Sequence, residues 1–306
     1  MSTTGGTSVI VLGMHRSGTS ATSRVLNRMG SWIGSEESVT RRFEHAAIQD
    51  INEDILRALG GRWHTPPDLI DGWSDDARLR ELDAPAQAAL ADLEGHAVFS
   101  WKDPRTCFTL PWWERHLAAP PVVVYVYRHP AEVAASLATR NDFGAAHAML
   151  MWEMYNGAAL RAAAGHRVIT MPFSELVDAP AATAAVLHDA LTGWGLALTA
   201  DPESAVEEVT SERRHHQAVP DLDPAVATPS QIQLWTRVQE LPRVSDAFVA
   251  PTADPMHQAT VELLAARRAA IVSRLELDER NRLLRSRRAL VRRLVRPGAA
   301  RRPPAT

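Results

Sequence analysis

The chain has 306 residues, 45% of them apolar, with a formal net charge of −3 at pH 7. This composition is typical of a soluble globular protein with a sizeable core, and the net charge argues against a general nucleic-acid binder. The single cysteine, Cys107, excludes a disulfide within the chain. It favours a reducing compartment, so we expect a cytoplasmic protein, with no basic leader or apolar run that would direct export.

Short apolar runs alternate with helical patterns along the first two thirds of the chain. The runs predict strands at residues 9–12, 97–101, 122–127 and 168–171. Helical periodicity is clear at residues 42–59, 84–93, 130–139, 145–163 and 181–191. This alternation predicts an α/β fold in which a P-loop-like parallel sheet is flanked by helices on both faces.

The last third of the chain has a different character. Six prolines between residues 201 and 254 indicate loops and short helices packed on the sheet. From residue 257 onward the sequence predicts one long basic amphipathic helix, so we expect an α/β domain at 1–256 and a helical extension at 257–306. Such a helix can lie peripherally on an anionic membrane or associate with a second copy, and it can equally pack as a solvated extension on its own domain.

A glycine-bracketed loop follows the first predicted strand. Gly13 and Gly18 allow a tight turn, and the helix that we expect to open over residues 17–20 would point its unpaired N–H groups at an anion. The spacing copies the loop of nucleotide triphosphatases, but Thr19 stands where that loop has a lysine, and the cation is Arg16. The loop therefore predicts an anion cradle unlike that of a magnesium-ATP enzyme. The alternative is an ordinary turn with a serine cap.

Two more segments follow predicted strands. Lys102 is the only lysine in the chain, which favours a required ammonium over genome drift. Arg128, with Ser136 on the next helix, could hold a second phosphate, whereas a magnesium-nucleotide enzyme would have an aspartate at such a strand end. Because ligands bind at the carboxyl ends of parallel strands, we expect all three segments at one crevice.

Residues 13–20, 101–105 and 127–137, in this order, resemble the sulfotransferases that use 3′-phosphoadenosine-5′-phosphosulfate. The likeness is greatest to bacterial members that act on carbohydrates or secondary metabolites, and it covers roughly residues 9–180. It implies that Arg128 and Ser136 bind the 3′-phosphate, that Lys102 approaches the sulfuryl group, and that no metal is needed. It also implies that the 5′-phosphosulfate is bound by His15, Arg16, Ser17, Gly18, Thr19 and Ser20, with Arg16 at a position where many relatives have lysine.

The acceptor hydroxyl needs a general base. Many cytosolic relatives have a histidine two residues after the lysine, but this chain has Pro104 there. Bacterial and carbohydrate-directed relatives use a glutamate on a helix after the first loop, which makes Glu44 the first choice, with His45 and Asp103 as alternatives.

Each of these carboxylates also has a structural reading. Glu44 could be an exposed helix residue paired with Arg41 or Arg42. Asp103 could pair with Arg105 or cap the next helix, as well as contact the acceptor.

Aromatic and basic clusters offer further contacts. Each of four tryptophans could stack on a sugar ring or pack in the core, and packing in the core is the favoured role: Trp63, Trp73, Trp112 and Trp113. The basic residues at 213–216 could reach the 3′-phosphate or form a solvated loop. The histidines have no spacing typical of a metal site.

The sequence thus predicts a sulfotransferase with Glu44, Lys102 and Arg16 as catalytic residues and Glu44, Trp63 and Asp103 near the acceptor. The acceptor is a hydroxyl of a glycan or small natural product. The alternatives are a nucleotide-dependent kinase with a degenerate loop and an inactive nucleotide-binding or membrane-attached scaffold.

Overall fold

A computed structural model describes residues 6–69, 71–206, 222, 226–252, 261, 262, 265, 266 and 269. The chain divides into two compact units, Met1–Thr260 and Val261–Thr306. The basic cluster at 213–216 lies outside the described residues. The expected basic helix at 257–306 also lies outside them, except for five positions. The named strands and helices all belong to the first unit.

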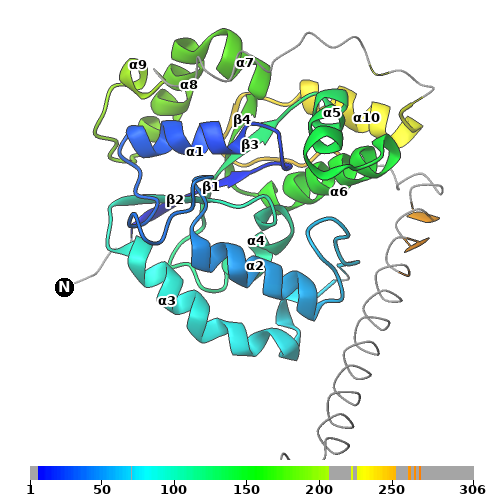
Figure 1. Ribbon diagram of the computed structural model, residues 1–306. Coiled ribbons are helices and arrows are strands. Elements are labelled where there is room, and N and C mark those ends of the chain that lie inside the picture. The colour runs from blue at the N-terminus through cyan, green and yellow to red at the C-terminus, as the bar shows by residue number, and fades with distance from the viewer. Residues whose placement is uncertain are drawn as a thin grey trace, which may run out of the picture. The chain divides into compact units, whose positions relative to one another are not determined.

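The first unit is built on a five-stranded sheet in the order β2-β1-β3-β4-β5 (Figure 1). Its strands are β1 (Thr7–Leu12), β2 (Val98–Lys102), β3 (Val122–Tyr127), β4 (Arg167–Pro172) and β5 (Val244–Ser245). β1 to β4 are parallel, which confirms the α/β class and the four predicted strands. β5 pairs antiparallel with β4, so the expectation of a wholly parallel sheet was wrong at this edge.

The helices form largely where the periodicity predicts them. They are α1 (Thr19–Arg28), α2 (Ala46–Ala58), α3 (Asp83–Glu94), α4 (Thr106–Trp113), α5 (Pro130–Asn141), α6 (Ala145–Ala163), α7 (Phe173–Asp178), α8 (Pro180–Gly193), α9 (Pro202–Ala205) and α10 (Pro229–Gln239), with 3₁₀ turns η1 (Trp73–Asp75) and η2 (Ala77–Leu82). α2 begins four residues later than expected. Phe43 has a left-handed φ of 58°, which a helix cannot contain, and Val39 and His45 form a bridge around it.

The two faces of the sheet are covered by different helices. Side chains alternate along a strand, so Val9 and Val11 pack with α1 and α8, while Ile10 and Leu12 pack with α2, α3, α4 and α6. Figure 1 shows α1 and α8 on one side of the sheet and α2 and α3 on the other. Helices therefore shield both faces of the sheet from solvent, as a parallel sheet requires.

The strand order creates a crevice beside β1. The chain leaves β1 to form β2 on one side and then crosses to form β3 on the other side. Connections that diverge in this way leave space outside the carboxyl ends of β1 and β3, where α/β proteins bind ligands. The loops after β1, β2 and β3 all emerge at this edge.

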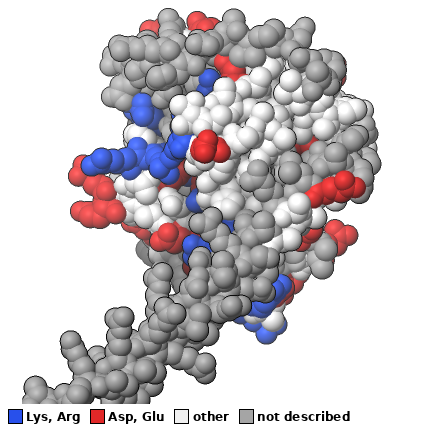
Figure 2. Space-filling view, turned by 45° about the vertical axis from the view of Figure 1, so that its right-hand side comes forward, with Lys and Arg blue, Asp and Glu red and all other residues white. Residues whose placement is uncertain are grey.

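The surface is mixed in charge on the face shown in Figure 2, where basic side chains lie beside aspartate and glutamate side chains. Within the parts of the chain that the structure describes, no helix is long and apolar enough to cross a membrane.

Candidate functional site

The loop after β1 is pinned at both ends. The backbone N–H of Gly13 donates to Cys107 Sγ at 3.2 Å, and the N–H of Ser17 donates to the Met14 carbonyl oxygen at 3.2 Å. Gly18 has a left-handed φ of 91°, and a Cβ there would lie 2.0 Å from the Phe173 ring. α1 consequently starts at Thr19, two residues later than the sequence predicted.

The first turn of α1 has backbone N–H groups that no described side chain caps. No side chain among the described residues caps this helix, so the predicted alternative of a serine cap is wrong. The Ser17 hydroxyl is fully buried in the loop and has no hydrogen-bond partner among the described residues. Uncapped N–H groups, a positive dipole end and an orphaned hydroxyl together form a site that suits an anion.

Arg16 connects this loop to the segment after β3. Its Nε donates to Ser136 Oγ at 2.8 Å, and its carbonyl oxygen accepts from an Arg128 guanidinium nitrogen at 3.2 Å. Arg128 also pairs with Glu132 at 3.1 Å and lies over the Phe173 ring. The structure thus brings Arg16, and not Arg128, into direct contact with Ser136.

Lys102 links the end of β2 to the first turn of α1. Its Nζ donates to Ser20 Oγ at 3.1 Å and to Glu44 Oε1 at 2.7 Å, and its side chain is 1% exposed. Burial lowers the pKa of Lys102 because it disfavours the charged ammonium, while the Glu44 carboxylate acts in the opposite direction. A buried cation and a buried carboxylate are therefore held together beside the first turn of α1.

Glu44 lies in the loop before α2 and not on the helix. Its backbone N–H donates to Thr40 Oγ1 at 3.3 Å, its carbonyl oxygen accepts from the Thr40 N–H at 2.8 Å, and the left-handed Phe43 turns the chain. Glu44 is buried and pairs with Lys102, so the exposed alternative with Arg41 or Arg42 was wrong.

The two alternative bases have other partners. Asp103 is buried, and both its carboxylate oxygens accept from Arg105 Nη1, at 2.9 and 3.0 Å, as one of its structural readings predicted. Burial raises the pKa of Asp103 while the Arg105 guanidinium lowers it. His45 Nε2 contacts Asp92 Oδ2 on α3 at 3.2 Å. Glu44 is the only one of the three that contacts Lys102 in the described part of the chain.

His15 is surrounded by aromatic rings. Its ring lies 4.8 Å from that of Trp63 and 5.3 Å from that of Tyr155, and its Nε2 lies 3.3 Å from the Tyr155 hydroxyl. Burial and the nearby cations, chiefly Arg105 and Lys102, hold the pKa of His15 well below its ordinary value. Tyr155 was missed by sequence reasoning because it lies within α6 without any motif around it.

The tryptophans separate into two groups. Trp112 and Trp113 are fully buried in the core, as the packing interpretation predicted. Trp63 is half-buried and stacks on the ring of Phe143 at 5.7 Å, and Trp73 is also half-buried against the core. Of these four side chains, Trp63 is the one that contacts the predicted anion loop.

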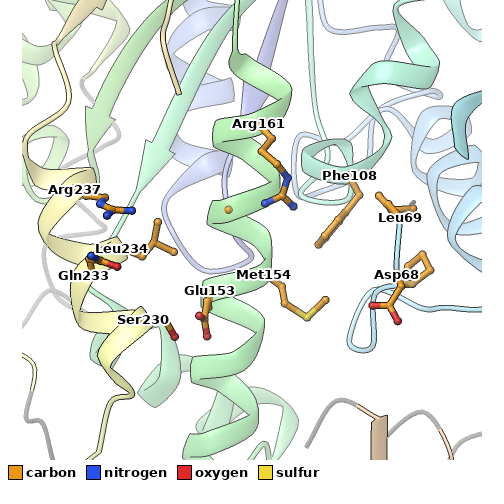
Figure 3. A pocket seen from close by; sticks show the side chains of 12 residues that line it. Asp68, Leu69, Phe108, Glu153, Met154, Arg161, Ser230, Gln233, Leu234 and Arg237 are labelled. Atoms are coloured by element: carbon orange, nitrogen blue, oxygen red, sulfur yellow. The ribbon is translucent and has the colours of Figure 1, made fainter. Parts of the chain in front are cut away.

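A separate cavity of about 240 Å³ opens between α6 and α10 (Figure 3). No predicted site residue lines it. Its nearest link to the site is Phe108, which lines the cavity and packs its ring 4.7 Å from that of Tyr155.

Among the described residues, no group of three or more His, Cys, Asp or Glu side chains could hold a metal ion. No known protein-family model matches the chain, and no curated protein matches it.

Proposed function

We propose that this chain is a sulfotransferase with a P-loop-like nucleotide site, which moves a sulfuryl group from 3′-phosphoadenosine-5′-phosphosulfate to a hydroxyl of a carbohydrate or natural product. The observation that carries the proposal is the position of Lys102. Its ammonium contacts Ser20 in the first turn of α1 and Glu44 in a separate loop. A cation and a potential base therefore meet beside an anion cradle.

The residues at this edge fit an anionic nucleotide. The orphaned Ser17 hydroxyl and the uncapped start of α1 supply hydrogen-bond donors to its 5′ groups. Arg128 and Ser136 would hold the 3′-phosphate, and Arg16, which already donates to Ser136, adds a second guanidinium there. Arg128 directly follows β3, at the place where a magnesium-nucleotide enzyme would have a carboxylate.

Lys102 and Glu44 would have different roles in the reaction. A bound donor would supply the sulfuryl group. Lys102 would stabilise the negative charge that develops on the departing nucleotide, and Glu44 would accept the proton of the acceptor hydroxyl at a carboxylate oxygen. Because the two side chains pair with each other at 2.7 Å, any turn of Lys102 toward the nucleotide would leave Glu44 free to act as a base.

The acceptor would lie against Trp63. The stacked rings of Trp63 and Phe143 are half-buried and adjoin His15, so they offer a flat apolar surface beside the anion loop. Such a surface suits the apolar face of a sugar ring or an aromatic ring. Asp103 would act indirectly, by orienting Arg105, with which it forms an ion pair. The cytoplasmic location stays a prediction.

Calorimetry separates this function from its alternatives. We expect 3′,5′-bisphosphoadenosine to bind in buffer containing EDTA, more tightly than ATP binds with magnesium. A preference for magnesium-ATP would instead identify a kinase. Where the bisphosphate binds but ³⁵S-labelled donor transfers no label to any glycan or phenol in a broad panel, the inactive scaffold is favoured.

Variants then test the assigned residues. With an acceptor found in that panel, Lys102→Ala and Glu44→Gln should each lower kcat by about 10²-fold or more, as loss of an electrostatic or proton-transfer group does. Glu37→Gln is the matched control, since Glu37 is an exposed glutamate of the same loop region. Full turnover in both variants would contradict the assignment.

A further inference from the structure

The hydrogen bonds around Tyr155 fix the protonation of His15. A tyrosine hydroxyl has one proton, and Tyr155 donates it to the Trp63 carbonyl oxygen at 2.6 Å. In the 3.3 Å contact with His15 Nε2, the Tyr155 oxygen must therefore be the acceptor. The proton of the neutral His15 ring thus lies on Nε2, which leaves Nδ1 with a free lone pair.

Cations on several elements act electrostatically on the His15 ring. Arg105 and Lys102 come from the end of β2 and the turn after it, Arg140 from α5, and Arg42 from the loop before α2. Together with burial, these cations keep the pKa of His15 well below 6.5. The uncharged Tyr155 faces it from α6 and His64 adjoins the same Trp63. Burial and these cations therefore favour the neutral form of His15 in the free protein.

We propose that His15 takes up one proton from solvent at Nδ1 when the phosphate and sulfate groups of a nucleotide bind to the loop after β1, and that the new N–H then donates to an anionic oxygen. This inference rests on the proposed function, because it needs the anion to bind in that loop. His15 is a residue of the loop itself, two positions before the orphaned Ser17 hydroxyl. Aromatic contacts with Trp63 and Tyr155 hold its ring in place.

The physical reason is a change in the field at the ring. Without ligand, four cations oppose a further positive charge on His15. A bound nucleotide brings several negative charges that offset them, so the pKa of His15 rises. Binding and protonation then become linked, and the affinity for the nucleotide should fall as pH rises between the free and the bound pKa values.

Calorimetry of 3′,5′-bisphosphoadenosine with the full chain tests this linkage. Titrations in EDTA, at several pH values between about 6 and 8 and in buffers of different ionisation enthalpy, give the number of protons taken up. The phosphates of the ligand also titrate near pH 6, so the decisive quantity is the difference between wild type and His15→Gln. Glutamine keeps an N–H for Tyr155 but cannot be protonated.

We expect wild type to take up more protons than His15→Gln, by up to about one near pH 6, with the difference vanishing toward pH 8. His64→Gln is the matched control, since its ring packs 5.3 Å from that of Trp63, and it should behave as wild type. Equal proton uptake in wild type and His15→Gln, with binding intact, would overturn this inference alone. Absence of bisphosphate binding by wild type would overturn the proposed function as well.

A spectroscopic measurement on the wild-type chain covers the case in which His15→Gln does not fold. ¹⁵N spectra of histidine-labelled protein distinguish a bare ring nitrogen from a protonated one. Tyr155→Phe identifies His15 among the 12 histidines, because it removes the partner of Nε2. Near pH 6 the Nδ1 resonance of His15 should change from bare to protonated on adding the bisphosphate, and a resonance that stays bare would contradict the proposal.

Discussion

The middle of the sheet and its carboxyl edge are equally buried but chemically opposite. All six residues of β3 are buried, and they are four valines and two tyrosines. At the edge, Ser17, Lys102 and Asp103 are no more than 2% exposed, yet all three are polar or charged. Apolar burial stabilises the middle, whereas polar burial at the edge costs free energy that pairing only partly offsets. The proposed function accounts for this difference, because a ligand site at the edge would need polar groups there at some expense of stability.

The largest effect should come from separating Lys102 from Glu44. Lys102→Met or Glu44→Leu alone leaves one buried charge without its partner, so each should lower the free energy of unfolding by about 3–5 kcal/mol. The double variant leaves neither charge and should return to within about 1 kcal/mol of wild type. Urea unfolding measures all four proteins. If the double variant instead lost the sum of the two single losses in free energy of unfolding, the two charges would not depend on each other, and the contrast with the apolar middle would not hold.

A truncation in the core provides the opposite case. Leu187 on α8 is fully buried against the sheet, so Leu187→Ala should lower the free energy of unfolding by about 2–5 kcal/mol through lost burial and a cavity. Because it lies in the core and not at the edge, affinity for 3′,5′-bisphosphoadenosine should be unchanged in the folded variant. Calorimetry of this variant that shows weakened binding would mean that core and edge are not separable.

Alanine substitutions at Gly18 and Gly72 separate the cost of a left-handed backbone from the cost of close packing at the edge. Gly18 and Gly72 both have left-handed φ values, but a Cβ at Gly18 would meet the Phe173 ring, whereas at Gly72 nothing lies within 4 Å. Gly72→Ala should cost about 1 kcal/mol from conformation alone. Gly18→Ala should cost more and should also weaken bisphosphate binding. Thermal unfolding of the two variants gives the comparison, and equal losses would show that the contact with Phe173 is unimportant.

The smallest effect on stability should come from Ser17. Its buried hydroxyl has no partner in the described part of the chain, so Ser17→Ala should leave the free energy of unfolding unchanged or slightly raised. Its affinity for the bisphosphate should nevertheless fall by about 2–10-fold, the value of one hydrogen bond. A stability loss above about 1 kcal/mol would mean that the hydroxyl has a structural partner.

The sequence was informative wherever one segment carried its own pattern. Apolar runs located β1 to β4, and the residues that follow three of them located the candidate site. β5 has only two residues and no apolar run, so periodicity could not detect it. The start of α2 was missed because the left-handed turn at Phe43 is accompanied by tertiary contacts with Ser23 and Arg24 on α1, which local periodicity does not reveal.

Pairing between distant side chains was the part that the sequence could not provide. Arg16 and Ser136 are 120 positions apart, and Lys102 and Glu44 are 58 apart, so only the tertiary fold brings them together. The motifs named all four residues but coupled Ser136 with Arg128. Tyr155 has no motif because its role depends on the position of α6 against the loop after β1.

Hydrogen exchange tests the central claim, that the carboxyl edge is an anion site, most directly. The N–H groups at the start of α1 are uncapped, so they should exchange rapidly in the free protein. Adding 3′,5′-bisphosphoadenosine in EDTA should slow exchange in residues 13–22 and 128–136. Slowed exchange only around the cavity between α6 and α10, or no change at all, would contradict the account.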